Sequence, residues 1–238
     1  MIEQKRQKSK FPKHFKAPIL NGCGQGCVKM IVHYFEDKEL PVDELNEICA
    51  VKTEGAFSGV FDIATGMAER GYEVIRISDI TPEDYGTDPL KYMRAVGFDP
   101  ENPAPIVKAR KESVEHYLSF VKQNKIENRP TAPSIQDIRA LTEDGFGLIC
   151  WVNSSGQRGD FNKTTGHYIV PIGIDEKNVI FHDPGYIDPV YGASFGVGIA
   201  ATHDLFLKYT YYPDTIGLNP DTQKPYGMGL LAFRLNKK

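Results

Sequence analysis

The chain has 238 residues, of which 41% are hydrophobic and 25% charged, and this composition excludes a disordered or low-complexity protein. Its formal net charge of -3 offers no basic field for binding nucleic acid. No run approaches the ~18 apolar residues of a membrane helix, and the four cysteines lack the spacing of a disulfide framework. The sequence therefore predicts a globular protein without a membrane span, in a reducing, cytoplasmic setting.

The first 16 residues, MIEQKRQKSKFPKHFK, carry six Lys or Arg and one Glu. Because no apolar stretch follows them, they do not resemble a secretory signal, and they predict a solvated basic tail. Residues 17–238 are expected to form a single domain, since a chain of this length can bury a substantial core. The oligomeric state is left open.

Apolar residues spaced three and four apart predict helices over residues 25–34, 41–51 and 58–70. The second of these places Pro41 in its first turn and Cys49 on its apolar face. Gly71 can end the third by adopting a left-handed conformation. The alternating sequence YEVIRIS that follows is typical of a strand.

Residues 81–130 are rich in Pro, Gly and acidic residues, and only KESVEHYLSFVKQ within them has helical spacing. We expect a polar insertion or lid with few apolar anchors, not a second core.

The second half of the chain favours strands. A helix over 134–144, with Ser134 and Asp137 as its capping pair, is followed by the strand candidates FGLICWV, HYIVPIGI and NVIFHD. A short helix over 202–210 and a strand over 228–235 come last. Helices that precede strands favour an α+β fold, with the helices packed on one side of an antiparallel sheet.

The segment NGCGQGCVKMI carries the main chemical signal, because Cys23 lies between two glycines where a helix should begin. Unpaired backbone N–H groups and the helix dipole favour a thiolate there. The alternative is that Cys23 is a small buried apolar residue. We interpret Cys27, on the apolar helix face, as a packing residue, with a redox or metal pair with Cys23 as the alternative, and Cys49 and Cys150 as core residues.

A nucleophilic thiolate needs a base, and the base needs an orienting group. His167 begins the strand HYIVPIGI, 144 residues after Cys23, within the interval of about 130–150 found in papain-like enzymes. Asp183 ends the next strand, from which its carboxylate could orient His167. Each residue also has a structural interpretation, His167 as a strand-end histidine and Asp183 as a turn residue before Pro184.

Two blocks of the sequence resemble a known family. CGQGCVKM and GHYIVPIGIDEKNVIFHDP are similar to the two motifs of the bacteriocin-processing, double-glycine leader peptidases, and PSIQDIRALTEDGFGLICWV is similar to the segment between these motifs in stand-alone members. The similarity covers most of residues 18–80 and 134–185. It implies a papain-like α+β fold, with Cys23 as nucleophile, His167 as general base and acid, and Asp183 as the orienting carboxylate. It implies no cofactor.

One position departs from the family. Its members carry a glutamine six residues before the cysteine, as an oxyanion-hole donor, whereas this chain has Ala17. Asn21 is the nearest amide side chain and is a tentative substitute, although its spacing is wrong. Loss of one such donor typically costs ~100 to 1000-fold in turnover.

Other sites are weaker. His167, His182 and Asp183 could form a metal site but lack a metal-binding spacing, and FGVGIAA lacks the full glycine pattern of a nucleotide site. The Tyr- and Gly-rich loop after Asp183 could border a substrate cleft.

Three functions remain open at this point. The first is a cysteine peptidase or amidase that cleaves a peptide or amide substrate through an acyl-thioester on Cys23. The second is an acyl transferase that uses the same residues with an amine or thiol acceptor. The third is a catalytically silent peptide-binding domain that has lost the oxyanion hole.

Overall fold

The structure is a computed structural model, and it describes residues 11–18, 22–51, 57–185, 196–212, 218–220, 225–227 and 229–236. In these ranges the helices are α1 (Cys23–Glu36), α2 (Val42–Ile48), α3 (Val60–Glu69), α4 (Pro82–Thr87), α5 (Pro89–Ala95), α6 (Pro103–Lys122), α7 (Ile135–Glu143), α8 (Ser154–Gln157) and α9 (His203–Tyr209). The strands are β1 (Tyr72–Ile77), β2 (Ile126–Arg129), β3 (Gly147–Asn153), β4 (Gly166–Ile174), β5 (Asn178–His182), β6 (Ile199–Thr202) and β7 (Leu230–Leu235).

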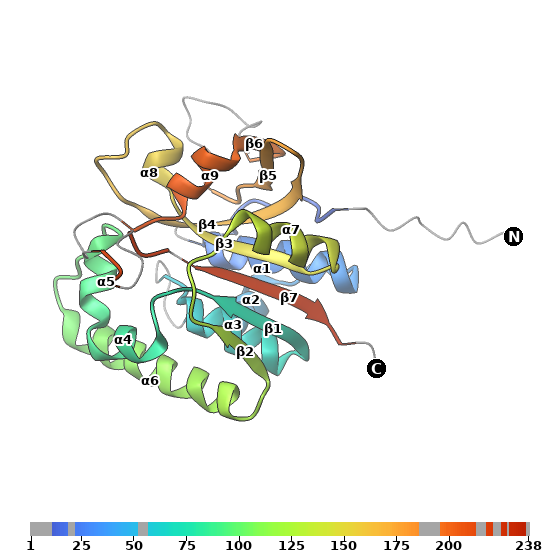
Figure 1. The fold of residues 1–238 in the computed structure, drawn as a ribbon. Helices are drawn as coiled ribbons and strands as arrows, with labels where there is room; N and C mark the ends of the chain where they lie inside the picture. The colour runs from blue at the N-terminus through green and yellow to red at the C-terminus, as the bar shows by residue number, and fades with distance from the viewer. Residues whose placement is uncertain are drawn as a thin grey trace, which may run out of the picture.

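The strands form one sheet in the order β2-β1-β7-β3-β4-β5-β6 (Figure 1). Every neighbouring pair is antiparallel except β1 and β2, which run parallel. The chain between these two strands is long and includes α4, α5 and α6, and parallel neighbours need such a crossover. The structure therefore combines helices with a mostly antiparallel sheet and is compatible with the expected α+β class, except that the edge strand β2 runs parallel to β1.

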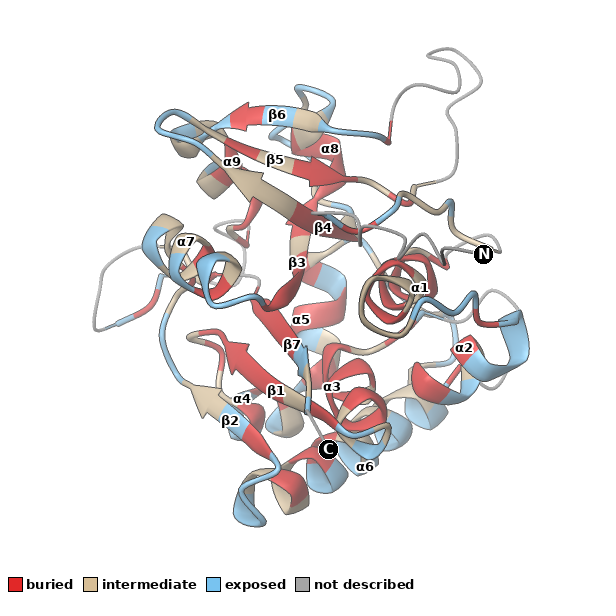
Figure 2. Ribbon diagram, turned by 90° about the vertical axis from the view of Figure 1, so that its right-hand side faces the viewer, coloured by how far each residue is buried: buried red, intermediate tan, exposed pale blue. Residues whose placement is uncertain are grey.

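Helices cover both faces of the sheet, not one face as expected. Because side chains alternate along a strand, Leu231 and Phe233 of β7 pack in one apolar cluster, and Leu230 and Ala232 pack in the other. Helices α1, α2, α3 and α6 contribute to the first cluster, whereas α7 and α9 contribute to the second. Figure 2 shows α1 and α3 on one side of the strands and α7 on the other. The central strands are thus buried on both faces.

The segment 81–130 packs on the main core. Two N-caps that the sequence carries, Thr81 and Asp88, start α4 and α5 with a proline directly after each cap. The segment buries eight apolar side chains, all but one of them in the cluster of α1 and α3: Tyr85, Tyr92, Met93, Ala95, Val114, Tyr117, Phe120 and Ile126. The expectation of few apolar anchors is therefore not met, because the aromatic residues of this segment supply them.

Most of the predicted helices are present near their expected bounds. The capping box of Ser134 and Asp137 forms at the start of α7, as the sequence predicts. Pro41 is the residue before α2 and not part of its first turn, and Gly71 follows α3 with a φ of 92°. Among the described residues, none of the helices is long and apolar enough to cross a membrane.

Candidate active site

Cys23 is the first residue of α1, and its sulfur lies beside His167 and Tyr168 near the start of β4. Gly22 caps the helix with its backbone alone, and the first helical hydrogen bond runs from Gly26 to Gly22. The first N–H groups of a helix have no partner inside it, so the N–H of Cys23 is not used by the helix. The thiol itself is half-buried.

His167 and Asp183 come from neighbouring strands. His167 is the second residue of β4, and Asp183 directly follows β5, which pairs with β4 along the sheet. Nε2 of His167 lies 2.6 Å from Oδ1 of Asp183, and the two side chains are 13% and 20% exposed. Because Nε2 donates its proton to a carboxylate, Nδ1 is the nitrogen that remains for Cys23. The hairpin β4–β5 thus orients the imidazole toward the start of α1.

The three side chains perturb one another's pKa values. Burial raises the pKa of the Cys23 thiol, but the charge of His167, its hydrogen bond to the sulfur and a hydrogen bond from the backbone of Tyr168 outweigh it, and the net pKa is lowered. Burial lowers the pKa of His167, and the charges of Asp183 and Cys23 reverse that effect and raise it well above its usual value. These shifts favour a thiolate paired with an imidazolium.

Asp183 keeps its charge through several hydrogen bonds. Burial raises its pKa. The charge of His167, its hydrogen bond and the hydrogen bond from the N–H of Gly185 outweigh burial, so the net pKa is lowered. The N–H of Gly185 donates to Oδ1 over 2.6 Å. A Cβ at Gly185 would lie 2.7 Å from that oxygen and 3.3 Å from Nε2 of His167, so glycine is required for this approach.

The described part of the N-terminal segment is hydrogen-bonded to the backbone at Asp183 and Pro184. Nε2 of His14 donates to the carbonyl oxygen of Asp183 over 2.9 Å, and the N–H of Ala17 donates to the carbonyl oxygen of Pro184 over 2.7 Å. Pro12 is buried and accepts a hydrogen bond from His182. Residues 12–17 therefore lie on the protein, whereas the sequence predicts a solvated tail up to residue 16.

No protein-family model matches the chain, and no curated protein matches it.

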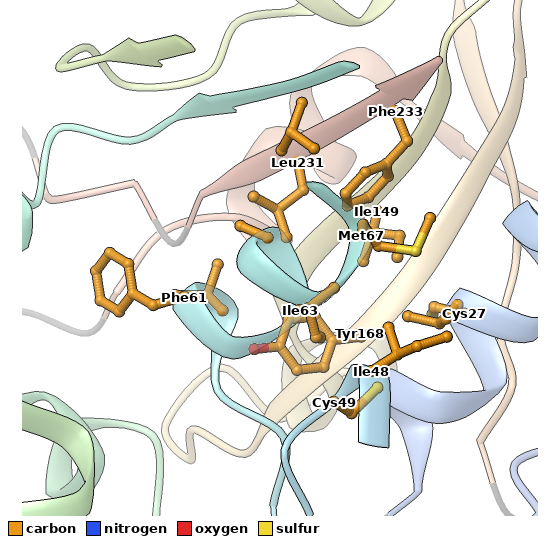
Figure 3. Close-up of a cluster of buried hydrophobic side chains, with 14 of the residues drawn as sticks. Cys27, Ile48, Cys49, Phe61, Ile63, Met67, Ile149, Tyr168, Leu231 and Phe233 are labelled. Atoms are coloured by element: carbon orange, nitrogen blue, oxygen red, sulfur yellow. The ribbon is translucent and has the colours of Figure 1, made fainter. Parts of the chain in front are cut away.

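The other three cysteines lie in apolar surroundings. Cys27 is fully buried, and Cys49 and Cys150 are each 1% exposed. Figure 3 shows Cys27 and Cys49 among the buried side chains of α2, α3 and the sheet. Burial raises the pKa of Cys49 to about 12 and raises the pKa of Cys27 and Cys150 as well. The four thiols thus differ by environment, and only that of Cys23 has a lowered pKa.

Other candidate site residues from the sequence either lie outside the described residues or are bonded elsewhere. Asn21, the tentative oxyanion donor, and most of the Tyr- and Gly-rich loop after Asp183 lie outside the described residues. His182 uses both ring nitrogens elsewhere, since Nε2 donates to Pro12 and Nδ1 accepts from Gly198. Among the described residues, no group of three or more His, Cys, Asp or Glu side chains could hold a metal ion.

Position 17 has no side-chain donor to offer an oxyanion. Ala17 carries a methyl group, and its N–H is already bonded to Pro184. The side-chain amide nearest in sequence on the helix, Gln25, is fully buried and bonds to Asn46 and Ser58. The N–H of Cys23, which the helix does not use, is a backbone donor directly beside the thiol.

A pocket adjoins Cys23, and no pattern in the sequence predicted it. It has an empty volume of about 740 Å³, its open mouth included. Its lining has three parts. The first is residues 57–60, at and just before the start of α3, and the second is Trp151 of β3 with residues of and next to β4. The third part comes from residues 85–110. The available signal was the aromatic content of the third part, which the sequence analysis set aside as a polar insertion.

Proposed function

We propose that this protein is a papain-like cysteine peptidase or amidase that cleaves a peptide or amide bond through an acyl-thioester on Cys23. The observation that carries the proposal is the 2.6 Å contact between His167 and Asp183, with the Cys23 thiol hydrogen-bonded to the same imidazole. Thiol acyl transfer requires a nucleophile hydrogen-bonded to a base, and the base is in turn oriented by a third group such as a carboxylate.

The reaction follows from the charges of the resting pair. The Cys23 thiolate attacks the substrate carbonyl carbon, and the Cys23 N–H stabilises the oxygen that becomes negative. When the C–N bond breaks, the His167 imidazolium gives its proton to the leaving amine. Water then attacks the thioester as His167 removes its proton, and the acid and the thiolate are released. Asp183 stabilises the imidazolium each time it forms.

The fold supports the proposal at a coarser level. The nucleophile is at the start of a helix that packs on the sheet, and the histidine and carboxylate lie on adjacent antiparallel strands. This arrangement fits the papain-like fold that the sequence motifs imply. The missing glutamine at position 17 leaves the oxyanion to backbone donors, from which we expect slow turnover.

Alkylation by iodoacetamide near neutral pH tests the proposal. We expect Cys23 to react ~100-fold or more faster than the three buried cysteines, because the thiolate is the reactive species. His167→Ala should slow this reaction about tenfold or more, since burial then raises the thiol pKa and each unit of pKa is a tenfold change in thiolate. Peptide mapping by mass spectrometry measures both rates.

The matched control is His116→Ala, because His116 is an exposed histidine on α6 whose Nε2 lies 3.5 Å from a carboxylate oxygen of Glu69. It should react as the unmodified protein does. If Cys23 reacts equally fast with and without His167, its reactivity reflects exposure alone, and a silent binding domain becomes the better interpretation. An activated ester that acylates Cys23 and is then hydrolysed would separate hydrolysis from transfer when amine or thiol acceptors are added.

A further inference from the structure

The pocket beside Cys23 has a wall that the catalytic residues do not provide. Tyr85 of α4, Met93 of α5 and Phe98 from the following turn contribute apolar surface to it. All three belong to the segment 81–130, which lies outside the sequence motifs. A pocket with an apolar lining that opens to a reactive group is typical of a small-molecule or side-chain binding site.

This wall is fixed to the catalytic strand. The N–H of Gly166, next to His167, donates to the carbonyl oxygen of Val96 over 3.1 Å. Gly97 has a φ of 79°, and a Cβ there would lie 2.6 Å from the carbonyl oxygen of Thr164. On the opposite side, the ring of Phe98 meets the ring of Phe57 edge to face, with centroids 4.7 Å apart. The wall therefore holds a defined position relative to Cys23.

Three polar side chains of the pocket lining, those of Arg110, Ser58 and Tyr168, already have hydrogen-bond partners in the protein. Arg110 binds Asp62 over 2.6 Å and the carbonyl oxygen of Phe57 over 2.7 Å. The Ser58 hydroxyl donates to Gln25. The Tyr168 hydroxyl donates to the carbonyl oxygen of Ser58 over 3.4 Å. An apolar ligand therefore enters without separating an ion pair, whereas an anionic ligand would lose water and would meet Arg110 already paired with Asp62.

The position of His167 decides which half of a substrate the pocket can hold. Cys23 lines the pocket, but His167 does not, although its neighbours Gly166 and Tyr168 do. The leaving amine must reach the imidazole to be protonated, so it lies on the His167 side of the sulfur. The other half, which stays on Cys23 as the thioester, is directed toward the pocket.

We propose that the pocket binds the acyl half of the substrate and selects an apolar side chain there. This assignment rests on the proposed function, because it takes Cys23 as the nucleophile. It gives the segment 81–130 a role in specificity that is separate from bond cleavage.

Binding can be measured without catalysis in the Cys23→Ala variant. Trp151, the single tryptophan of the chain, lines the pocket, so its fluorescence reports occupancy directly. The probes are acetyl-, butyryl-, phenylacetyl- and succinyl-glycinamide. We expect affinity to rise about fourfold for each methylene buried, with phenylacetyl tightest and succinyl weakest.

Three further substitutions, each placed in the Cys23→Ala background, locate the site. Val96→Phe fills the pocket and Phe98→Ala removes part of its wall, and each should weaken phenylacetyl-glycinamide about tenfold or more. The matched control Val42→Phe places the same ring on the exposed face of α2 and should leave affinity unchanged. Thermal unfolding identifies a variant that fails to fold. If Val96→Phe does not fold, Phe98→Ala alone tests the site.

Equal affinity for all four probes, tighter binding of succinyl-glycinamide, or unchanged binding in both folded pocket variants would overturn the proposal. The iodoacetamide experiment on the unmodified protein separates this failure from failure of the proposed function. A fast-reacting Cys23 with no preference among the probes overturns the pocket assignment alone. A slow-reacting Cys23 with apolar preference intact overturns the catalytic role and the assignment to an acyl half.

Discussion

The cleft around Cys23 has two walls that differ in chemistry. The catalytic wall, made by the start of α1, the start of β4 and the end of β5, holds charged groups in contact with one another. The segment wall, made by residues 85–110, is mainly apolar, and its Arg110 is paired with Asp62. If Cys23 is the nucleophile as proposed, its reactivity depends on electrostatics in the first wall, and the proposed selectivity depends on burial of apolar surface in the second.

The largest expected effect comes from removing the charge at Asp183. In Asp183→Ala, the charge and hydrogen bond of Asp183 no longer raise the pKa of His167, and only Cys23 opposes the effect of burial, so the imidazolium and the thiolate are both less stable. We expect iodoacetamide alkylation of Cys23 near neutral pH to fall ~100-fold. Asp183→Asn keeps an oxygen for Nε2 and should fall less, about tenfold.

Comparing the two variants separates orientation from charge. If Asp183→Asn reacts as slowly as Asp183→Ala, the negative charge carries the whole effect. If both react as the unmodified protein does, Asp183 has no influence on the thiolate, and the contact between Asp183 and His167 does not control the reactivity of Cys23.

The pH dependence of alkylation and hydrolysis comes next. The lowered pKa of Cys23 means that the thiolate is present below the usual thiol pKa of about 8.5, so alkylation should already be fast at neutral pH. The raised pKa of His167 means that the imidazolium persists above about 6.5 and is lost only on the alkaline side. Hydrolysis of an amide substrate should therefore follow a bell-shaped profile between these two limits.

The control for this profile is the His167→Ala variant. Its alkylation should increase only as pH approaches or exceeds the normal thiol range, because the cation that lowers the pKa of Cys23 is gone. A profile that is identical in both proteins would contradict the ion pair.

A smaller effect is expected in the segment wall. Arg110→Met leaves Asp62 without its partner, at side-chain exposures of 17% for Arg110 and 13% for Asp62. Breaking such a pair should lower the free energy of unfolding by about 2–4 kcal/mol, since an unpaired carboxylate stays partly buried. Denaturant unfolding measures the loss, and Lys111→Met, an exposed change on the same helix, is the matched control.

The double variant Asp62→Asn with Arg110→Met tests the cause. If the cost arises from the unpaired charge, the double variant should regain part of the lost stability. A double variant with the summed cost of both changes would show that the ion pair does not hold the wall.

The two walls also differ in how far the sequence predicts them. Cys23 between glycines, His167 at a strand start and Asp183 at a strand end are signals that depend on local position, and the structure brings all three together. Helices with regular apolar spacing, such as α1 and α7, are also readable for this reason. The contact between Val96 and Gly166 joins distant parts of the chain, and no local pattern encodes it.

The elements that sequence analysis missed are short or weakly patterned. Strand β2 has the sequence IENR, in which only Ile126 is buried, so it lacks the alternation by which a strand is recognised. Helices α4 and α5 have six and seven residues, too few for a helical period to stand out against their Pro and Gly content. The apolar alternation along β7 allows helices on both faces of the sheet, but it does not specify that α7 and α9 pack on the second face.

The smallest expected effect sharpens the boundary between the walls. Tyr168 belongs to both, because its backbone is hydrogen-bonded to the Cys23 sulfur while its side chain lines the pocket. Tyr168→Phe removes only the long 3.4 Å hydrogen bond to Ser58 and keeps the ring, which stacks on Trp151 at 5.9 Å. The free energy of unfolding should fall by no more than about 1 kcal/mol. Since the backbone N–H remains, alkylation of Cys23 should stay within about twofold, and a larger loss would mean that the hydroxyl, not the backbone, supports the thiolate.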